Sequence, residues 1–336
     1  MDAPEERQPH KPLLEVSADE AGQKLFQFLI RRTDLPGGAV MKLVRTGQVR
    51  VDGKRSKPYD RLAQGSMVRI PPRLAEELQN ASAQAPDTAD TAAAPDSVGA
   101  SHSPPLVIIA KGEDGILAID KPAGLPTHGG TGHTDSIASR LSAMLPEASF
   151  APTPAHRLDK DTSGVLLAAT SYTALTALQQ AFQTRTVEKR YLAWVSGKFP
   201  SGGPYSLEDS LAKSGRPGSQ KMHTDASDGK RAVSHVRLVR STKNASLVEV
   251  RLLTGRTHQI RLQLASRGFP LIGDVKYGGP GGSPLLLHAW RIAFPADVLP
   301  GHGAQEYVSL PCWPEPYAVM SRPDEWPRTP TAPWSF

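Results

Sequence analysis

The sequence has little of what disulfides, metal sites and membrane spans require. Cys312 is the only cysteine in 336 residues, so an internal disulfide and a multi-cysteine zinc site are both excluded. The histidines are scattered without a ligand spacing such as His-Glu-x-x-His, so we expect no metal. No stretch approaches the roughly 18 apolar residues of a membrane span. Met1 to Lys11 is polar and lacks the apolar core of a secretory signal. We therefore expect a soluble protein of the reducing cytoplasm.

The charge balance is mildly basic. Lys and Arg number 39 against 33 Asp and Glu, which gives a formal charge of +6. This excess favours a polyanionic partner without identifying one. The basic residues are dense between residues 13 and 73, where they form either a solvated surface or an electrostatic RNA-docking surface. The candidate RNA contacts in this segment are Arg31, Arg32, Arg45 and Arg50.

Composition divides the chain into four segments. Residues 13–73 predict a small α/β module, with helices over 21–32 and near 40–44 and a hairpin turn at Asp52-Gly53. Residues 74–105 contain too few large apolar residues to fold and predict a flexible linker. Residues 106–312 form the second domain. The Pro- and Trp-rich residues 313–336 predict a tail that lies over this domain or frays from it.

The second domain mixes strand and helix patterns without regular alternation, which is typical of an α+β fold. Apolar runs and alternations predict strands near 107–109, 116–119, 164–170, 191–195 and 248–252. Helical spacing predicts helices over 172–184 and 257–267, the second with Thr257 as its N-cap and Gly268 just past its end.

Asp159 is the first candidate for chemistry. It lies in the segment His156-Arg157-Leu158-Asp159-Lys160-Asp161-Thr162-Ser163-Gly164, between a polar loop and an apolar strand. A rigid strand can hold a reactive group at its entrance. However, an aspartate before Thr-Ser-Gly is more often a turn residue that bonds nearby backbone N–H groups. Asp161 fits that turn role better, because it is adjacent to Thr162.

Two further clusters accompany it. On a helix that begins near Thr257, His258 and Arg261 are three residues apart and share a face. An arginine there can fix a carboxylate in bidentate geometry, or it can be an ordinary surface residue. Tyr191 alternates with Ala193 and Val195, which is typical of a core tyrosine, although a tyrosine also stacks on bases.

Together these clusters resemble the RluA-type family of pseudouridine synthases. Residues 156–164 match its signature, and similar stretches follow the family's order at 120–125 with His128, 189–193, 254–261, 273–278 and 287–289. Residues 13–72 resemble the S4 RNA-binding module that many members carry. The module departs from its usual pattern, with Lys24-Leu25-Phe26 in place of Arg-Leu-Asp and Gly37-Gly38-Ala39 in place of Ser-Arg-Ser.

The resemblance implies a catalytic domain with a mixed, mainly antiparallel sheet flanked by helices and loops. It implies a uridine-to-pseudouridine isomerase that needs no cofactor. Asp159 would open the glycosidic bond, Arg261 would pair with it and keep it ionised, and Tyr191 would pack on the flipped base. Within the same domain, the implied RNA contacts are Lys121, Arg157, Arg256 and His258.

The RNA target is indicated by two stretches. Val68 to Pro72 and the loop from His128 to Gly132 look most like family members that act on large-subunit (23S) ribosomal RNA. We therefore expect a monomer that acts on this RNA, either naked or in pre-ribosomal particles. The same chemistry on tRNA and a non-catalytic RNA-binding assembly factor are the alternatives. A glycosidase would need a second acid, and no matching segment supplies one.

Overall fold

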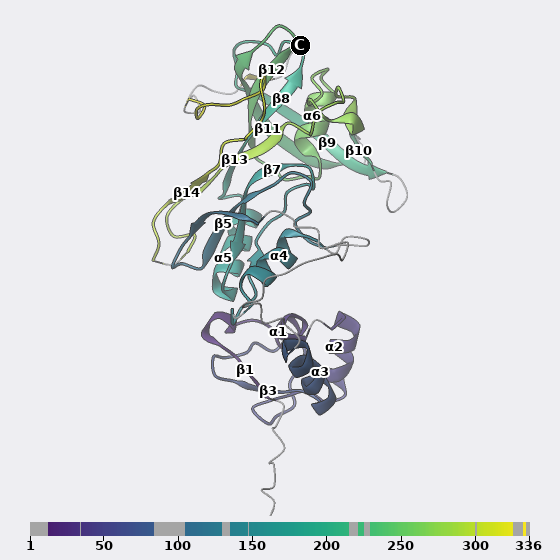
Figure 1. Cartoon of the computed structure of the whole chain (residues 1–336), viewed down its shortest axis with the longest axis vertical. Coiled ribbons are helices and arrows are strands. Elements are labelled where there is room, and N and C mark those ends of the chain that lie inside the picture. The colour runs from purple at the N-terminus through teal and green to yellow at the C-terminus, as the bar shows by residue number, and fades with distance from the viewer. Residues whose placement is uncertain are drawn as a thin grey trace, which may run out of the picture. The chain divides into compact units, whose positions relative to one another are not determined.

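The computed structural model describes residues 13–33, 35–83, 105–129, 135–146, 148–214, 221–224, 229–299, 301–324 and 332–333. The chain forms two compact units (Figure 1). The smaller comprises Met1–Pro105, Glu147–Ala151 and Ser171–Thr173, and the larger comprises Leu106–Pro146, Pro152–Thr170 and Ala174–Phe336. Among the described residues, no helix is both long and apolar enough to cross a bilayer.

The smaller unit packs short helices on a three-stranded antiparallel sheet. The sheet has the order β1 (Leu13–Glu15), β3 (Met67–Arg69), β2 (Arg50–Val51). The helices are η1 (Ala18–Glu20), α1 (Leu25–Thr33), α2 (Gly37–Arg45) and α3 (Pro72–Ala83). Asp52 and Gly53 both have positive φ, 48° and 77°, as a two-residue hairpin turn requires. The predicted hairpin turn is confirmed.

The start of the predicted linker is wrong. Residues 72–83 form α3, in which Leu74 is buried and Leu78 packs against the core of the smaller unit. These two leucines are four residues apart and share a helical face, which is enough to anchor the segment. The rest of the predicted linker, 84–104, lies outside the described residues.

The larger unit is built on a twelve-stranded sheet. Its main path runs β10 (Lys221–Thr224), β9 (Tyr205–Ser214), β11 (Lys230–Ser241), β12 (Ala245–Leu252), β8 (Glu188–Ser196), β13 (Leu287–Phe294), β7 (Ser163–Ala169), β5 (Ile116–Lys121), β4 (Val107–Lys111). Off this path, β14 (Gln305–Val308) pairs with β13, β6 (Thr153–Pro154) with β7 and β15 (Ala332–Pro333) with β9. Only β13–β7 and β15–β9 are parallel among the described pairs, so the predicted mixed, mainly antiparallel sheet is confirmed.

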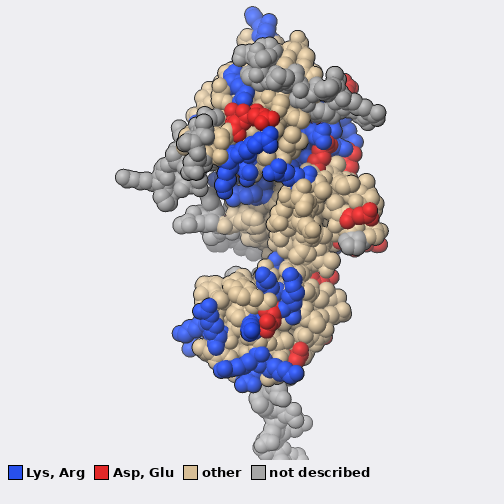
Figure 2. Space-filling model, turned by 180° about the vertical axis from the view of Figure 1, so that it is seen from behind, with Lys and Arg blue, Asp and Glu red and all other residues tan. Residues whose placement is uncertain are grey.

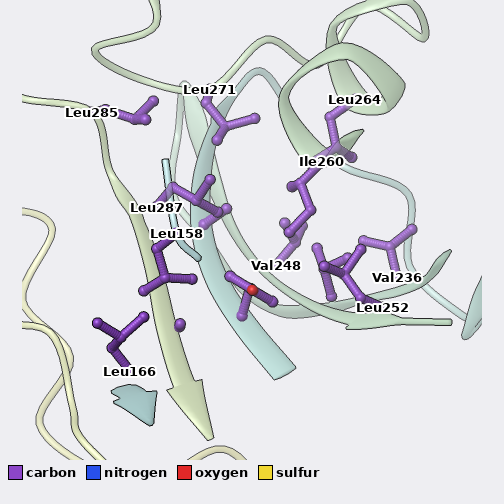
Figure 3. Close-up of a cluster of buried hydrophobic side chains, with 14 of the residues drawn as sticks. Leu158, Leu166, Val236, Val248, Leu252, Ile260, Leu264, Leu271, Leu285 and Leu287 are labelled. Carbon is purple, nitrogen blue, oxygen red and sulfur yellow. The ribbon is translucent and has the colours of Figure 1, made fainter. Parts of the chain in front are cut away.

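Strand β8 has both faces covered. Tyr191, Ala193 and Val195 belong to the main core, whereas Leu192 and Trp194 belong to a second cluster. This is the two-residue alternation of a strand. In the main core, Ile260 and Leu264 point from α6 (Gln259–Ala265) toward the sheet (Figure 3). The same core takes in buried side chains of α4 (Ile137–Met144).

The second cluster is covered by the end of the chain. Trp313, Tyr317 and Val319 pack against it, and the indole N–H of Trp194 donates to the Tyr317 carbonyl at 2.9 Å. Residues of the described segment 313–324 of the predicted tail therefore lie over the sheet, and residues 332–333 extend it as β15. The other helices of the larger unit are α5 (Tyr172–Thr184), which matches its predicted bounds, and η2 (Val275–Tyr277).

The parallel pair β7–β13 needs a glycine. Gly164 has φ +108°, and a Cβ there would stand 2.3 Å from the carbonyl oxygen of Ala289. Beside it, the Ser163 hydroxyl and Nδ1 of His288 are 2.8 Å apart, while Nε2 lies 3.1 Å from the Ser309 carbonyl. A carbonyl only accepts, so the proton is on Nε2 and the serine donates to Nδ1. Burial lowers the pKa of His288 to about 4. These contacts fix the start of β7 at Ser163, four residues after Asp159.

Candidate active site

One pocket brings together the three clusters that are separated in the sequence. Asp159 enters it from the loop before β7, and Tyr191 from β8. The segment around His258, before α6, closes a third side. Of the predicted site residues, those that line the pocket are Arg157, Asp159, Tyr191, Arg256, His258 and Arg261.

The loop that carries Asp159 is held by hydrogen bonds from residues 121–127. The Thr127 hydroxyl accepts from the Leu158 N–H at 3.2 Å and lies 3.1 Å from the Leu158 carbonyl. The Gly124 N–H donates to the Lys160 carbonyl at 2.9 Å. Both residues adjacent to Asp159 are therefore tied to one neighbouring segment. Thr127 was not predicted from the sequence, although it lies in the family-like stretch between residue 120 and His128.

Lys121 belongs to this support, and the prediction that it contacts RNA is wrong. Its side chain is fully buried, and Nζ donates to the carbonyls of Pro122, Leu125 and Lys160 at 2.9, 2.7 and 2.9 Å. Burial lowers its pKa to about 8, although the nearby charges of Asp161 and Asp159 oppose this shift. Three carbonyl acceptors match the three donors of an ammonium group. Lys121 is thus a structural cation beneath the Asp159 loop.

The prediction that Asp161 shapes this loop is also wrong. Its side chain is exposed and makes no hydrogen bond with a described residue. The turn is closed by the backbone instead, where the Thr162 N–H donates to the Asp159 carbonyl at 3.1 Å.

Among the described Lys, Arg and His side chains, only His258 lies within 4 Å of the Asp159 carboxylate. Its Nε2 lies 3.8 Å from Oδ2 of Asp159, which is too long for a hydrogen bond. Its Nδ1 lies 2.8 Å from the Tyr277 hydroxyl. Burial lowers the pKa of His258 more than the charge of Asp159 raises it, so the ring is neutral near pH 7. With Tyr277 donating to Nδ1, the Nε2–H faces the carboxylate.

The backbone at His258 explains why the helix begins later than predicted. His258 has φ 53° and ψ 23°, a left-handed conformation that is uncommon outside glycine, and α6 starts at Gln259. The buried side chain of Gln259 holds the preceding loop. Its Oε1 accepts from the Arg256 N–H at 3.0 Å and from the Thr254 hydroxyl at 2.8 Å. The start at Thr257 predicted from its capping propensity is wrong.

The predicted ion pair between Arg261 and Asp159 is absent from the described residues. Nε and Nη2 of Arg261 instead donate to the two carboxylate oxygens of Asp274, both at 2.7 Å. The guanidinium also lies over the Tyr277 ring, 5.2 Å from its centroid. Burial lowers the pKa of Arg261, but the hydrogen bonds and charge of Asp274, with a smaller effect of Asp159, raise it overall. Arg261 therefore acts on Asp159 only through its field.

Asp274 and Tyr277 complete the pocket's support, and neither was singled out from the sequence. Both lie in the family-like stretch 273–278, which was the available signal. The Asp274 carboxylate, 0% exposed, caps η2 by accepting from the Tyr277 N–H at 3.3 Å. Tyr277 then reaches His258, so one chain of contacts joins Arg261 to the residue beside Asp159.

Tyr191 presents a neutral phenol to the pocket. Burial raises its pKa, and the charge of Asp159 raises it further. A phenolate is thereby disfavoured at neutral pH. The ring can contact a bound base and its hydroxyl can donate a hydrogen bond.

The predicted RNA contacts outside the pocket differ in availability. Arg32 is committed to Glu20 through two hydrogen bonds of 2.6 and 2.9 Å. Arg31 is largely buried, with its guanidinium 4.5 Å from the ring centre of Phe150. Arg45 and Arg50 are exposed. Lys and Arg form a dense group on one face of the larger unit and several separate groups on the smaller (Figure 2).

Comparison with known proteins identifies the family of this chain. Residues 115–266 match the family described as RNA pseudouridylate synthase. The chain is 34% identical over 318 residues to ribosomal large subunit pseudouridine synthase C of Escherichia coli strain K12, covering 90% of this chain and 93% of the relative. The Yersinia pestis protein of the same name is 34% identical over 293 residues, covering 84% and 87%. This chain belongs to the RluA-type family of RNA pseudouridine synthases.

Solved structures support the fold of this synthase. Human RNA Pseudouridylate Synthase Domain Containing 1 aligns with a TM-score of 0.51 and 23% identity, covering 63% of this chain and 84% of that chain. Human RNA Pseudouridylate Synthase Domain Containing 4 gives 0.50 and 24%, covering 60% and 87%. The catalytic fold expected from the resemblance is confirmed.

Proposed function

We propose that this pseudouridine synthase isomerises uridines of large-subunit ribosomal RNA, with Asp159 as the catalytic carboxylate. The observation that carries the proposal is the convergence of Asp159, Tyr191 and His258 in one pocket, from segments far apart in the sequence. The relatives match nearly the whole chain and are named as synthases of the ribosomal large subunit, which supports the ribosomal target. The proposed enzyme works as a monomer, on naked RNA or on pre-ribosomal particles.

The proposed reaction needs one carboxylate and no added atom. Asp159 attacks C1′ of the flipped uridine or stabilises its cationic centre, and the bond from C1′ to N1 breaks. The uracil stays in the pocket, rotates and rejoins C1′ through C5. If Asp159 has bonded to C1′, that bond breaks in the same step and the carboxylate is released. C5 loses its proton and N1 gains one, so substrate and product have the same composition. Tyr191 packs on the base during rotation, and the backbone contacts of Leu158 and Lys160 hold the loop that carries Asp159.

The smaller unit supplies the second part of the proposal. We infer that residues 13–83 form the S4-like RNA-binding module, with exposed Arg45 and Arg50 as its phosphate contacts. Replacing both by glutamine is expected to lower the salt dependence of RNA affinity by about two phosphate contacts. An unchanged salt slope would refute these two contacts without bearing on Asp159.

The experiment for the activity maps pseudouridines by carbodiimide-blocked primer extension. Ribosomal RNA and tRNA are taken from cells that lack the gene, complemented with wild type, Asp159→Asn or Asp161→Asn. Asp161 is the matched control, because it is an exposed carboxylate two residues away. We expect wild type and Asp161→Asn to restore marks in large-subunit RNA and Asp159→Asn to restore none. Restoration by Asp159→Asn would refute the catalytic assignment, and marks lost only from tRNA would refute the ribosomal target.

A further inference from the structure

A second pocket adjoins the candidate active site and has no acidic lining. The two pockets share five residues, among them Tyr191 and Arg256. Among the residues that the structure describes, four cationic side chains and no Asp or Glu line the second pocket. The cations are Arg157, Arg185, Lys189 and Arg256. Such a concentration of one sign beside a reaction site favours a bound anion.

Lys189 is the most constrained of these cations. It lies two residues before Tyr191 on β8, so both side chains are on the same face of the strand. It is partly buried near the Phe182 ring, and it forms no ion pair with a described carboxylate. Burial lowers its pKa, and the positive charge of Arg185 lowers it further. A half-buried cation beside another cation is stabilised when an anion arrives.

The nearest acidic residue in the sequence is already neutralised. Glu188 lies on the opposite face of β8 and is contacted by Arg190, Arg251 and Arg291. It is therefore not a partner for Lys189. Arg185 and Lys189 also line a neighbouring pocket that contains Glu188 and Glu208, but neither cation forms an ion pair with a described carboxylate.

Arg185 is held in a backbone conformation that arginine rarely adopts. It follows the last residue of α5 with φ 62°, and the next N–H, that of Thr186, donates to the Ala181 carbonyl at 3.1 Å. This is the helix ending in which glycine is favoured, because a Cβ is disfavoured there. An arginine at this position lines the pocket at the expense of backbone strain, a pattern common at functional sites.

We propose that the second pocket binds a phosphodiester group of the RNA strand next to the target uridine, with Arg185 and Lys189 as its contacts. The inference rests on the proposed function, since an RNA-modifying enzyme always meets a phosphate adjacent to its target. The site makes the enzyme depend on a polymeric substrate, because free uridine offers no such group. It fixes the position of the strand without reading a base.

The test is a double-mutant cycle between the protein and the RNA. An RNA hairpin with a mapped target uridine carries one uncharged methylphosphonate, either 5′ or 3′ to that uridine. Dissociation constants are measured for wild type, Lys189→Met and Lys198→Met. Lys198 is the matched control, because it is an exposed lysine beyond the other end of β8.

We expect the methylphosphonate to weaken wild-type binding about 10-fold at one of the two positions, the scale of a hydrogen bond to a charged group. Lys189→Met is expected to lose a similar factor with the charged RNA and nothing more with the neutral linkage at that position. Lys198→Met is expected to behave as wild type. Independent, additive losses at both positions would overturn the phosphate site.

A second variant separates a loss of RNA binding from a loss of protein stability. Arg185→Gly is expected to keep or raise the melting temperature, because glycine suits the left-handed position. It is expected to weaken RNA binding and reduce the salt slope by about one phosphate contact. Unchanged affinity and slope would contradict the proposal. A wild type that forms no pseudouridine would refute the proposed function, whereas absent coupling in an active wild type would overturn only this site.

Discussion

Arg261 and Asp274 form a buried, bidentate ion pair beside the candidate active site. Both hydrogen bonds are 2.7 Å long, and the side chains are 8% and 0% exposed. The arginine that was expected to bind Asp159 is thus fully paired with another carboxylate. Asp159 keeps its oxygens available for substrate, while the contacts of Arg261 with Asp274 and Tyr277 position His258 beside it.

Asp274→Asn should therefore destabilise the larger unit strongly. Asparagine keeps one acceptor but leaves the Arg261 charge buried without its counter-charge, which costs about 3 kcal/mol. The measurement is urea unfolding near pH 7.5. Glu208→Gln is the control, since its pair with Arg231 is exposed at 54% and 69% and is worth less than about 1 kcal/mol. Equal effects of the two substitutions would contradict this account.

Lys121→Met should slow catalysis without weakening RNA binding. The substitution removes three hydrogen bonds to loop carbonyls and leaves these acceptors unpaired, so the Asp159 loop shifts. A misplacement of about 1 Å can lower the rate about 100-fold. Single-turnover rates and dissociation constants measured on one RNA separate the two effects. Lys160→Met, in the exposed part of the same loop, should retain the rate. An unchanged rate with weaker binding for Lys121→Met would restore its role as an RNA contact.

The stability of the larger unit should fall as the pH drops below about 6.5. Burial lowers the pKa of His288 to about 4, so between pH 4 and 6.5 this side chain is protonated in the unfolded chain but neutral in the folded protein. Stability from this group is complete above the unfolded pKa of about 6.5 and is lost as the pH falls toward 4, at ~1.4 kcal/mol per pH unit. His288→Gln can still accept from Ser163 and donate to Ser309. Between pH 6.5 and 4 its unfolding free energy should therefore fall by about 1.4 kcal/mol less per pH unit than that of wild type. Parallel curves for both proteins would contradict this.

Local patterns predicted the elements well where apolar periodicity was strong. The helix 172–184 and the alternation at Tyr191, Ala193 and Val195 agree with the structure, because both depend on the chain's own spacing. The α3 segment was assigned to the linker since its composition resembles the residues that follow. The segment has few large apolar residues, but two of them, Leu74 and Leu78, pack against the core of the smaller unit.

For the candidate site, the sequence predicted several lining residues but not the contacts that these residues make. Asp159, Tyr191, Arg256 and His258 were predicted and do line one pocket. Their partners were not predictable from local patterns. Arg261 could have paired with Asp159 or with Asp274, and only the folded structure shows that it pairs with Asp274. The burial of Lys121 likewise depends on the path of the loop above it, which no periodicity describes. Supporting contacts between distant segments emerge only from the three-dimensional fold.

Gly164→Ala should disrupt the start of β7 far more than a glycine substitution elsewhere. Two effects combine there: φ is +108°, and the added methyl would lie 2.3 Å from the Ala289 carbonyl oxygen. Gly282→Ala is the matched control, because its φ is +90° and no heavy atom lies within 4 Å of the place that its added methyl would take. The control should lose about 1–2 kcal/mol from backbone strain alone. Gly164→Ala should lose about 1–3 kcal/mol more, since the parallel strands must separate. Because Ser163 and Asp159 lie on the same chain segment, we also expect a lower single-turnover rate in Gly164→Ala only. Equal losses in unfolding free energy for the two variants would mean that strand contact with Ala289 does not determine the glycine in this signature.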